Sequence, residues 1–236
     1  SSDLIAPPAG SGMAALESDP DRPALIVYSS GTTALPKGAM LTHCIWRKAF
    51  DGGVRFELTP QDRLYLCVPL FGVMVAYAVG GETVAGWIHD PVGGRTAMAA
   101  RGEGTWIEGR RIALSGPHRL DSMHGIIALR TGDRARAARM AARSDRLASV
   151  LLLRCAAHEY LALLEGGAHF AFYNRIMPWD HAPGVCLVEE AGGHACRLDG
   201  RRYRPGDLAT GGASLLVATD AAHWRLVHEG IIAEGG

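Results

Sequence analysis

Apolar and polar positions in this chain recur with two spacings, which together predict a protein that mixes helices and strands. Short apolar runs bounded by turn residues are typical of strands, and an apolar position every three or four residues is typical of helices. The expected strands are 24–28, 73–79, 83–89, 95–100, 104–107, 125–129, 150–153, 169–173, 195–198 and 214–218. The expected helices are 133–149, 156–164, one between Asp180 and Gly192 that includes 185–191, and 221–232.

The apolar run 64–79 is the stretch that could suggest a membrane span. It contains Pro69 and Gly72 and is shorter than the roughly 20 residues that a spanning helix needs. Two buried strands joined at 69–72 are therefore expected, and no membrane segment.

Composition narrows the class of protein further. A hydrophobic share of 48% over 236 residues is ample for a buried core. Lys+Arg and Asp+Glu balance at 24 each, so nothing favours nucleic acid or an acidic membrane surface as a partner. The five cysteines form no Cys-x-x-Cys pair, which favours reduced thiols and a cytoplasmic location. A homo-oligomer remains open.

The stretch around Trp179-Asp180 is the first candidate for chemistry. Pro178 forces an extended approach, Asp180 is expected to cap a helix, and Gly192 is expected near the end of that helix. A carboxylate beside several free backbone N–H groups would suit a metal ion bridged to a phosphate. The alternative is a capped, buried helix without chemistry.

A loop that follows the strand 24–28 is the second candidate. Its hydroxyls, glycines and one lysine could wrap a polyphosphate with backbone N–H groups and a point cation, so ATP is a possible ligand at 29–37. It is not a Walker A loop, and by composition alone a hydroxyl-rich surface loop is the alternative. The candidate residues are Ser29, Ser30, Gly31, Thr32, Thr33 and Lys37.

With its flanks at 23–28, 38–43 and 58–63, this loop resembles the phosphate-binding signature of the adenylate-forming acyl-CoA synthetase and ligase (AMP-binding) family. The resemblance covers about residues 3–71. Ala34 stands where that family has Gly, and the family's later motifs for adenine, ribose and the catalytic lysine have no match after Phe71.

The second half of the chain resembles a different family. Trp179-Asp180-x-Ala-x-Gly before a helix that ends in Glu-Ala-Gly-Gly at 190–193, with the segments 81–86, 89–91 and 101–104, is similar to the inositol monophosphatase family over about residues 70–233. The implied fold is an α/β (mixed α+β) fold: a partial inositol-monophosphatase-like layered α/β/α/β sandwich with a foreign N-terminal segment. The implied domains are 1–71 and 72–236, with a seam at 69–72.

This second resemblance implies Mg²⁺-dependent hydrolysis of phosphate monoesters. The family takes its metal carboxylates from a Glu-Glu pair, an Asp-Pro-x-Asp-Gly-Thr loop and the Trp-Asp motif, and only the last is present here, as Asp180. Cys155, Ala156 and Ala157 occupy the stretch that contacts sugar hydroxyls in the family, and Tyr173 lies near the position of its sugar-binding Glu. The Asp-Pro sequence at Asp90 lacks the second Asp and is interpreted as a plain turn.

Three functional hypotheses follow. The first is a Mg²⁺-dependent hydrolase of a small sugar or inositol phosphate, impaired by its missing ligands; the others are an ATP-binding adenylate-forming fragment and a non-catalytic chimera. The two parts of the chain resemble different families, so the residues of each are patterned for a different core. This conflict predicts marginal stability of the folded chain. Cys155 and His158 are expected on one helical face, without the third group that a nucleophilic pair needs. Six histidines are interpreted as structural: His158, His169, His181, His194, His223 and His228.

Overall fold

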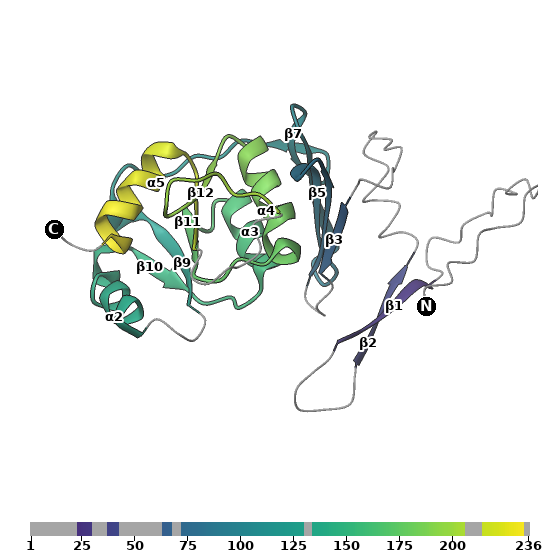
Figure 1. Cartoon of the computed structure of the whole chain (residues 1–236), viewed down its shortest axis with the longest axis horizontal. Helices are drawn as coiled ribbons and strands as arrows, with labels where there is room; N and C mark the ends of the chain where they lie inside the picture. Colours follow the sequence, from purple (N-terminus) through teal and green to yellow (C-terminus); the bar gives the residue numbers. More distant parts are fainter. Residues whose placement is uncertain are drawn as a thin grey trace, which may run out of the picture.

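The computed structural model describes residues 72–129, 134–205 and 214–233 in full, together with the backbone of three earlier strands. Those strands are β1 (Pro23–Ser29), β2 (Lys37–Thr42) and β3 (Arg63–Cys67). From β3 onward the elements form four layers: a six-stranded sheet, two helices, a five-stranded sheet, and an outer layer of helices (Figure 1). The expected mixed α+β class is confirmed.

The six-stranded sheet is an antiparallel meander in the order β3-β4-β5-β6-β7-β8. Its further strands are β4 (Val73–Val79), β5 (Glu82–Asp90), β6 (Arg95–Ala100), β7 (Gly104–Ile107) and β8 (Arg110–Ile112). The run 64–79 divides between β3 and β4 as expected. Gly80 and Gly81 turn the β4–β5 hairpin with φ of 58° and 82°, a region that glycine adopts without steric cost.

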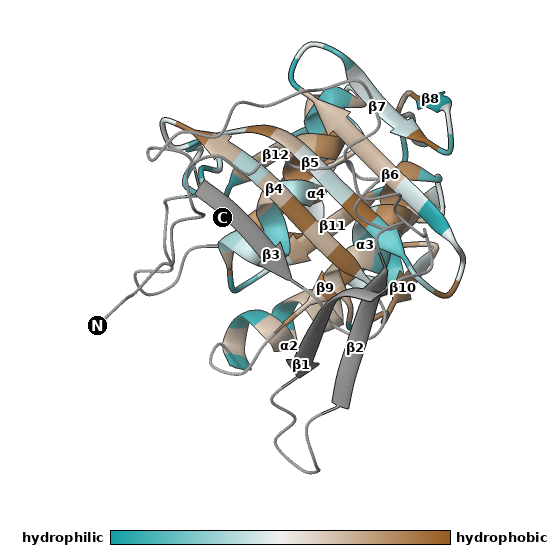
Figure 2. Ribbon diagram, turned by 90° about the vertical axis from the view of Figure 1, so that its right-hand side faces the viewer, coloured by the Kyte–Doolittle hydropathy of each residue, from teal (hydrophilic) through white to brown (hydrophobic). Residues whose placement is uncertain are grey.

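Both faces of this sheet are apolar, because successive residues of strands such as β4 are apolar and alternate side chains point to opposite faces. Met74, Ala76 and Ile88 point into the main core. Val73, Val75, Tyr77, Ala85 and Trp87 form a separate buried cluster with Val84, Met98 and Ala100 packed against it. Figure 2 views this sheet face-on, with apolar residues along β4 and β5.

The five-stranded sheet has the order β10-β9-β11-β13-β12. Its strands are β9 (His124–Ala128), β10 (Ser149–Leu151), β11 (Phe170–Tyr173), β12 (His194–Arg197) and β13 (Leu215–Ala218). β9 pairs in parallel with β10 and β11, whereas β13 runs antiparallel to β11 and β12. Phe170 and Phe172 pack on one face of it, and Ala171 and Tyr173 face the central helices.

The central helices, α3 (Ala156–Leu164) and α4 (Pro178–Glu190), lie between the sheets (Figure 1). Helix α4 contacts strands of both sheets, and its residues 181–188 are all buried. Gly86 and Gly184 allow the close approach: a Cβ on Gly86 would lie 2.8 Å from the carbonyl oxygen of Pro183, and one on Gly184 would lie 2.2 Å from the Tyr160 ring.

Of the outer helices, α2 is shorter than expected: it is Arg134–Ala142 instead of 133–149. The helix α5 (Ala221–Val227) continues as a π-helical turn, His228–Ile232, and together they cover the expected span 221–232. A 3-10 turn, Ser144–Arg146, leads instead into β10, because the chain must reverse to pair with β9. Arg143, in the turn that follows α2, donates to the carbonyl of Ala233 and ties this turn to the C-terminal helical segment.

Within the described residues, no helix is both long enough and apolar enough to cross a membrane.

Candidate functional site

The start of α4 carries the Trp-Asp motif, but the helix begins earlier than expected. Met177 is extended (φ −123°, ψ 132°), as a residue before proline should be, and Pro178 is the first helical residue. Asp180 therefore lies within the first turn and is not the cap, which corrects the expectation. Proline's fixed φ suits the first helical position, and this outweighs the preference of Asp for the cap. Pro183 consequently lies in the helix interior.

This helix start also offers fewer free N–H groups than expected. Pro178 has none, and the N–H groups of Asp180 and His181 both donate to the carbonyl of Met177, at 3.1 and 3.0 Å. The expectation of several free backbone donors beside the carboxylate is wrong. What remains is a half-buried Asp180 side chain in the first turn, where the helix dipole favours a negative charge.

The start of α3 contains the three residues expected to contact a sugar. Cys155 is the N-cap with an extended backbone (φ −144°), so it precedes the helix. The expectation that Cys155 and His158 share one helical face is therefore wrong. Its sulfur faces the N–H groups of Ala157 and His158. Ala157 is 1% exposed, whereas Cys155 and Ala156 are half-buried.

The two helix starts lie close enough to interact electrostatically. Burial is the main cause that raises the pKa of the Cys155 thiol and of the Glu159 carboxyl, and the charge of Asp180 raises both pKa values further. Glu159 is 4% exposed and its carboxyl faces the N–H groups of Cys155 and Arg154. No role was expected for Glu159 from the sequence, because it stands one position beyond the place that a Glu takes in a capping box after Cys155.

A buried aromatic cluster supports these helix starts. The Tyr160 hydroxyl lies 3.1 Å from Nδ1 of His181, and Nε2 of His181 lies 3.2 Å from the carbonyl oxygen of Arg175. Since a carbonyl only accepts, Nε2 carries the hydrogen and Nδ1 accepts from Tyr160. Tyr173 packs on both rings, with centroids at 5.7 Å from Tyr160 and 4.5 Å from His181.

Tyr173 is only 3% exposed, so it is a core residue here. Burial raises its pKa well above the ordinary value, and its side chain faces Glu159. The Tyr173 side chain, expected near the position of the family's sugar-binding Glu, therefore points into the core and not toward a ligand.

The described residues do not fit a magnesium site of the kind the family implies. They contain no group of three or more His, Cys, Asp or Glu side chains that could hold a metal. Asp90 accepts the N–H groups of Val92 and Gly93, at 3.1 and 2.8 Å, and the Arg95 guanidinium, as expected for a turn. A divalent ion with several oxygen ligands would need carboxylates besides Asp180 that this part of the chain does not bring together.

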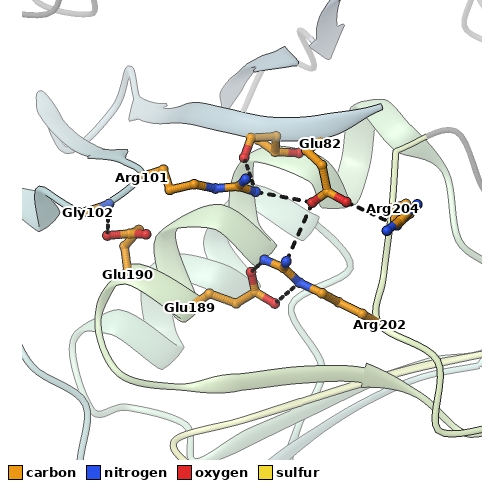
Figure 3. Close-up of polar contacts among 8 residues, drawn as sticks. Glu82, Arg101, Gly102, Glu189, Glu190, Arg202 and Arg204 are labelled. Carbon is orange, nitrogen blue, oxygen red and sulfur yellow. Dashed lines mark hydrogen bonds and ion pairs between the residues drawn. The ribbon is translucent and has the colours of Figure 1, made fainter. Parts of the chain in front are cut away.

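A polar network lies at the other end of α4 (Figure 3). The carboxylate of Glu82 forms ion pairs with the guanidinium groups of Arg101, Arg202 and Arg204, with N–O distances of 3.2, 3.5 and 3.0 Å. Arg202 also pairs with the carboxylate of Glu189 at 2.7 Å. The adjoining cavity of about 30 Å³ has room for one or two waters.

This network joins the β4–β5 hairpin to α4. Glu190 accepts the N–H groups of Gly102 and Gly104 at 3.0 and 3.1 Å, which anchors the β6–β7 turn to the same helix end. Ten residues of helix, about 15 Å, separate it from Asp180. Its arginines are matched by carboxylates, so it positions elements and is not continuous with the Asp180 site.

The candidate ATP loop lies mostly outside the residues that the structure describes. Four of its candidate residues, Ser30, Gly31, Thr32 and Thr33, are among those not described. Its ends are the last residue of β1 and the first of β2: Ser29 pairs with Lys37 in an antiparallel register. The expected strand 24–28 is confirmed.

Comparisons with known proteins agree with the layered fold. A model of the inositol monophosphatase family matches residues 61–234, and a model of the AMP-binding enzyme family matches residues 5–87. The first match covers well over half of the chain. The chain belongs to the inositol monophosphatase family, and its first part is similar to AMP-binding enzymes; the two matches overlap at residues 61–87.

The related sequences come from bacteria and a plant. "Fructose-1,6-bisphosphatase/inositol-1-monophosphatase" of Thermotoga maritima is 30% identical over 135 residues, 57% of this chain and 52% of the relative. "Nus factor SuhB" of Escherichia coli K12 is 32% identical over 154 residues, 61% of this chain and 56% of the relative. The chain spans about half the length of the curated relatives it matches.

Solved structures show the same fold. The extragenic suppressor protein suhB of Bartonella henselae aligns with a TM-score of 0.64 and 18% identity, covering 72% of this chain and 70% of that one. The IMPase of Thermotoga maritima aligns with a TM-score of 0.62 and 21% identity, covering 88% and 87%.

Proposed function

We propose that the Asp180 site is the phosphate-ester site of an inositol monophosphatase family member, and that its reaction is hydrolysis of a small sugar or inositol phosphate. The observation that carries the proposal is the position of Asp180, in the first turn of α4 and beside the start of α3, in a chain of that family. The Thermotoga maritima relative is named for a fructose-1,6-bisphosphatase and an inositol-1-monophosphatase, which supports the substrate class.

Turnover is expected to be impaired. The family's chemistry uses Mg²⁺ to bind the phosphate and activate water, but the described residues do not fit such an ion, because they bring together no group of three or more His, Cys, Asp or Glu side chains. Asp180 itself would repel a phosphate dianion without a cation between them. We therefore assign Asp180 as the retained ligand position and derive no catalytic step from it.

The test is phosphate release from a panel of sugar and inositol phosphates, with and without Mg²⁺. Asp180→Asn keeps the size of the side chain and removes its charge, and Asp121→Asn, at an exposed surface position, is the matched control. Slow turnover that requires both Mg²⁺ and Asp180 is expected. Equal release by wild type and Asp180→Asn would refute the assignment.

A second candidate function is ATP binding at 29–37, which the match of residues 5–87 to AMP-binding enzymes favours. Equilibrium binding of ATP to the full chain should be abolished by Lys37→Ala and kept by Lys48→Ala, which removes the same charge outside the loop. If neither variant changes ATP binding, the loop is not the site.

The third candidate is a non-catalytic chimera with a boundary near 69–72. It becomes the preferred reading if the full chain neither releases phosphate nor binds ATP. In that case residues 72–236 are a phosphatase-derived region that carries a foreign N-terminal segment.

A further inference from the structure

Arg154 has an unusual backbone conformation directly before the start of α3. Its φ is +57°, in the left-handed region, where a residue with a Cβ meets steric resistance that glycine avoids. Such a residue persists only when its surroundings hold it in place. The next residue, Cys155, returns to an extended conformation and caps the helix.

The group that can hold this turn is Glu159, one helical turn further on. Its side chain is nearly completely buried, and its carboxyl faces the N–H groups of Arg154 and Cys155 together with the side chain of Tyr173. A buried carboxyl needs such donors, because burial without them is strongly unfavourable. Glu159 and the strained turn therefore depend on each other.

An anionic ligand beside Asp180 would need a positive partner. The start of α4 supplies few donors, since the N–H groups of Asp180 and His181 are engaged by Met177. Asp180 acts electrostatically on both Cys155 and Glu159, so the turn borders the Asp180 site. Arg154 is exposed, which leaves its guanidinium in reach of solvent and of an anion.

We propose that Glu159 is a positioning residue that holds the Arg154–Cys155 turn in its left-handed form and thereby presents the Arg154 guanidinium to the phosphate group of a ligand at Asp180. The part that concerns the ligand rests on the proposed function above. The part that concerns the turn does not depend on that function: it rests on the backbone conformation of Arg154, on the burial of Glu159 and on the two N–H groups that its carboxyl faces.

The experiment reads the turn through Cys155, whose half-buried thiol lies within it. Alkylation of Cys155 by iodoacetamide is followed by peptide mass spectrometry in the native full chain. Glu159→Ala is expected to raise the rate about fivefold or more, the factor that corresponds to the loss of about 1 kcal/mol of local stability. Glu159→Gln, whose amide oxygen still accepts hydrogen bonds, should stay within about twofold of wild type.

A second substitution separates release of strain from general damage. Arg154→Gly removes the steric resistance, so the double variant with Glu159→Ala should return close to the wild-type rate. A merely structural role of Glu159 in the core would not be repaired by glycine at position 154. Rates that do not rise in Glu159→Ala, or that Arg154→Gly does not restore, overturn the positioning role.

The ligand part is read by protection of Cys155 with inorganic phosphate. Wild type and Glu159→Gln should be protected, whereas Arg154→Gly should need roughly tenfold more phosphate, as expected for the loss of one charge-assisted contact. Absence of protection in wild type overturns the role of Arg154 and counts against the proposed phosphate site. The alkylation rates without phosphate still decide the role of Glu159, so the two failures are distinguishable.

Discussion

Replacing Gly184 by alanine should destabilise the protein by driving α3 and α4 apart. The new Cβ would lie 2.2, 2.3 and 2.4 Å from three carbons of the Tyr160 ring, far inside an ordinary contact distance. Tyr160 is fully buried and its hydroxyl is bonded to His181, so the ring cannot move without losing that bond. The helix must shift instead.

The magnitude follows from three contributions. Overpacking of a core costs about 1–3 kcal/mol, and loss of the Tyr160–His181 hydrogen bond adds about 1 kcal/mol. Alanine in place of glycine within a helix returns about 1 kcal/mol. The net loss in the free energy of unfolding is about 2 kcal/mol, which for a chain of this size lowers Tm by roughly 4–8 °C.

The assay is urea unfolding followed by tryptophan fluorescence, with far-UV circular dichroism to test for coincident transitions. Gly167→Ala is the matched control, because a Cβ at Gly167 meets its nearest atom at 3.5 Å. That control should change the free energy of unfolding by less than about 0.5 kcal/mol. If Gly184→Ala is no more destabilising than the control, the close packing of α3 on α4 is not as described.

Four further outcomes are expected. Burial lowers the pKa of His169, so the unfolded chain binds its proton more readily; urea midpoints should fall as the pH drops below about 6.5, and less so in His169→Asn. Burial raises the pKa of Cys186 to about 12, so its thiol should resist iodoacetamide at pH 8 until urea unfolds the chain. Arg146→Ala removes a 2.7 Å hydrogen bond to the carbonyl of Gly230 and should cost about 1 kcal/mol by urea unfolding. Calorimetry should show low thermal stability, and a sharp, cooperative transition at high temperature would contradict the conflict between the two halves.

Elements set by local signals were predictable from the sequence. The β4–β5 hairpin follows from two glycines between apolar runs, and the end of α3 follows from Gly166, whose φ is +78°. The start of α4 could not be predicted in this way. Pro178 and Asp180 each signal a helix start, and only the packed structure selects between them. The length of α2 depended on pairing between β9 and β10, which is not a local property.

The candidate site was predictable only in part. Asp180 stands in a helical first turn, close to its expected place, although as a third residue and not as a cap. Glu159 was missed because its proximity to Asp180 arises from the packing of α3 against α4. The family resemblance placed Tyr173 near the position of the sugar-binding Glu, but alternation along β11 turns its side chain into the core.

The bare backbone at Gly86 has a consequence for any attempt to rebuild a complete metal site. Strand β5 touches α4 through this residue, with Pro183 as its neighbour, so the gap between sheet and helix is no wider than two backbones require. A side chain at position 86 would collide with the backbone of α4 at Pro183. Because a helix moves as a rigid unit, the end of α4 that carries Asp180 would shift away from the sheet. Carboxylates grafted onto the sheet can converge on Asp180 only if position 86 remains glycine.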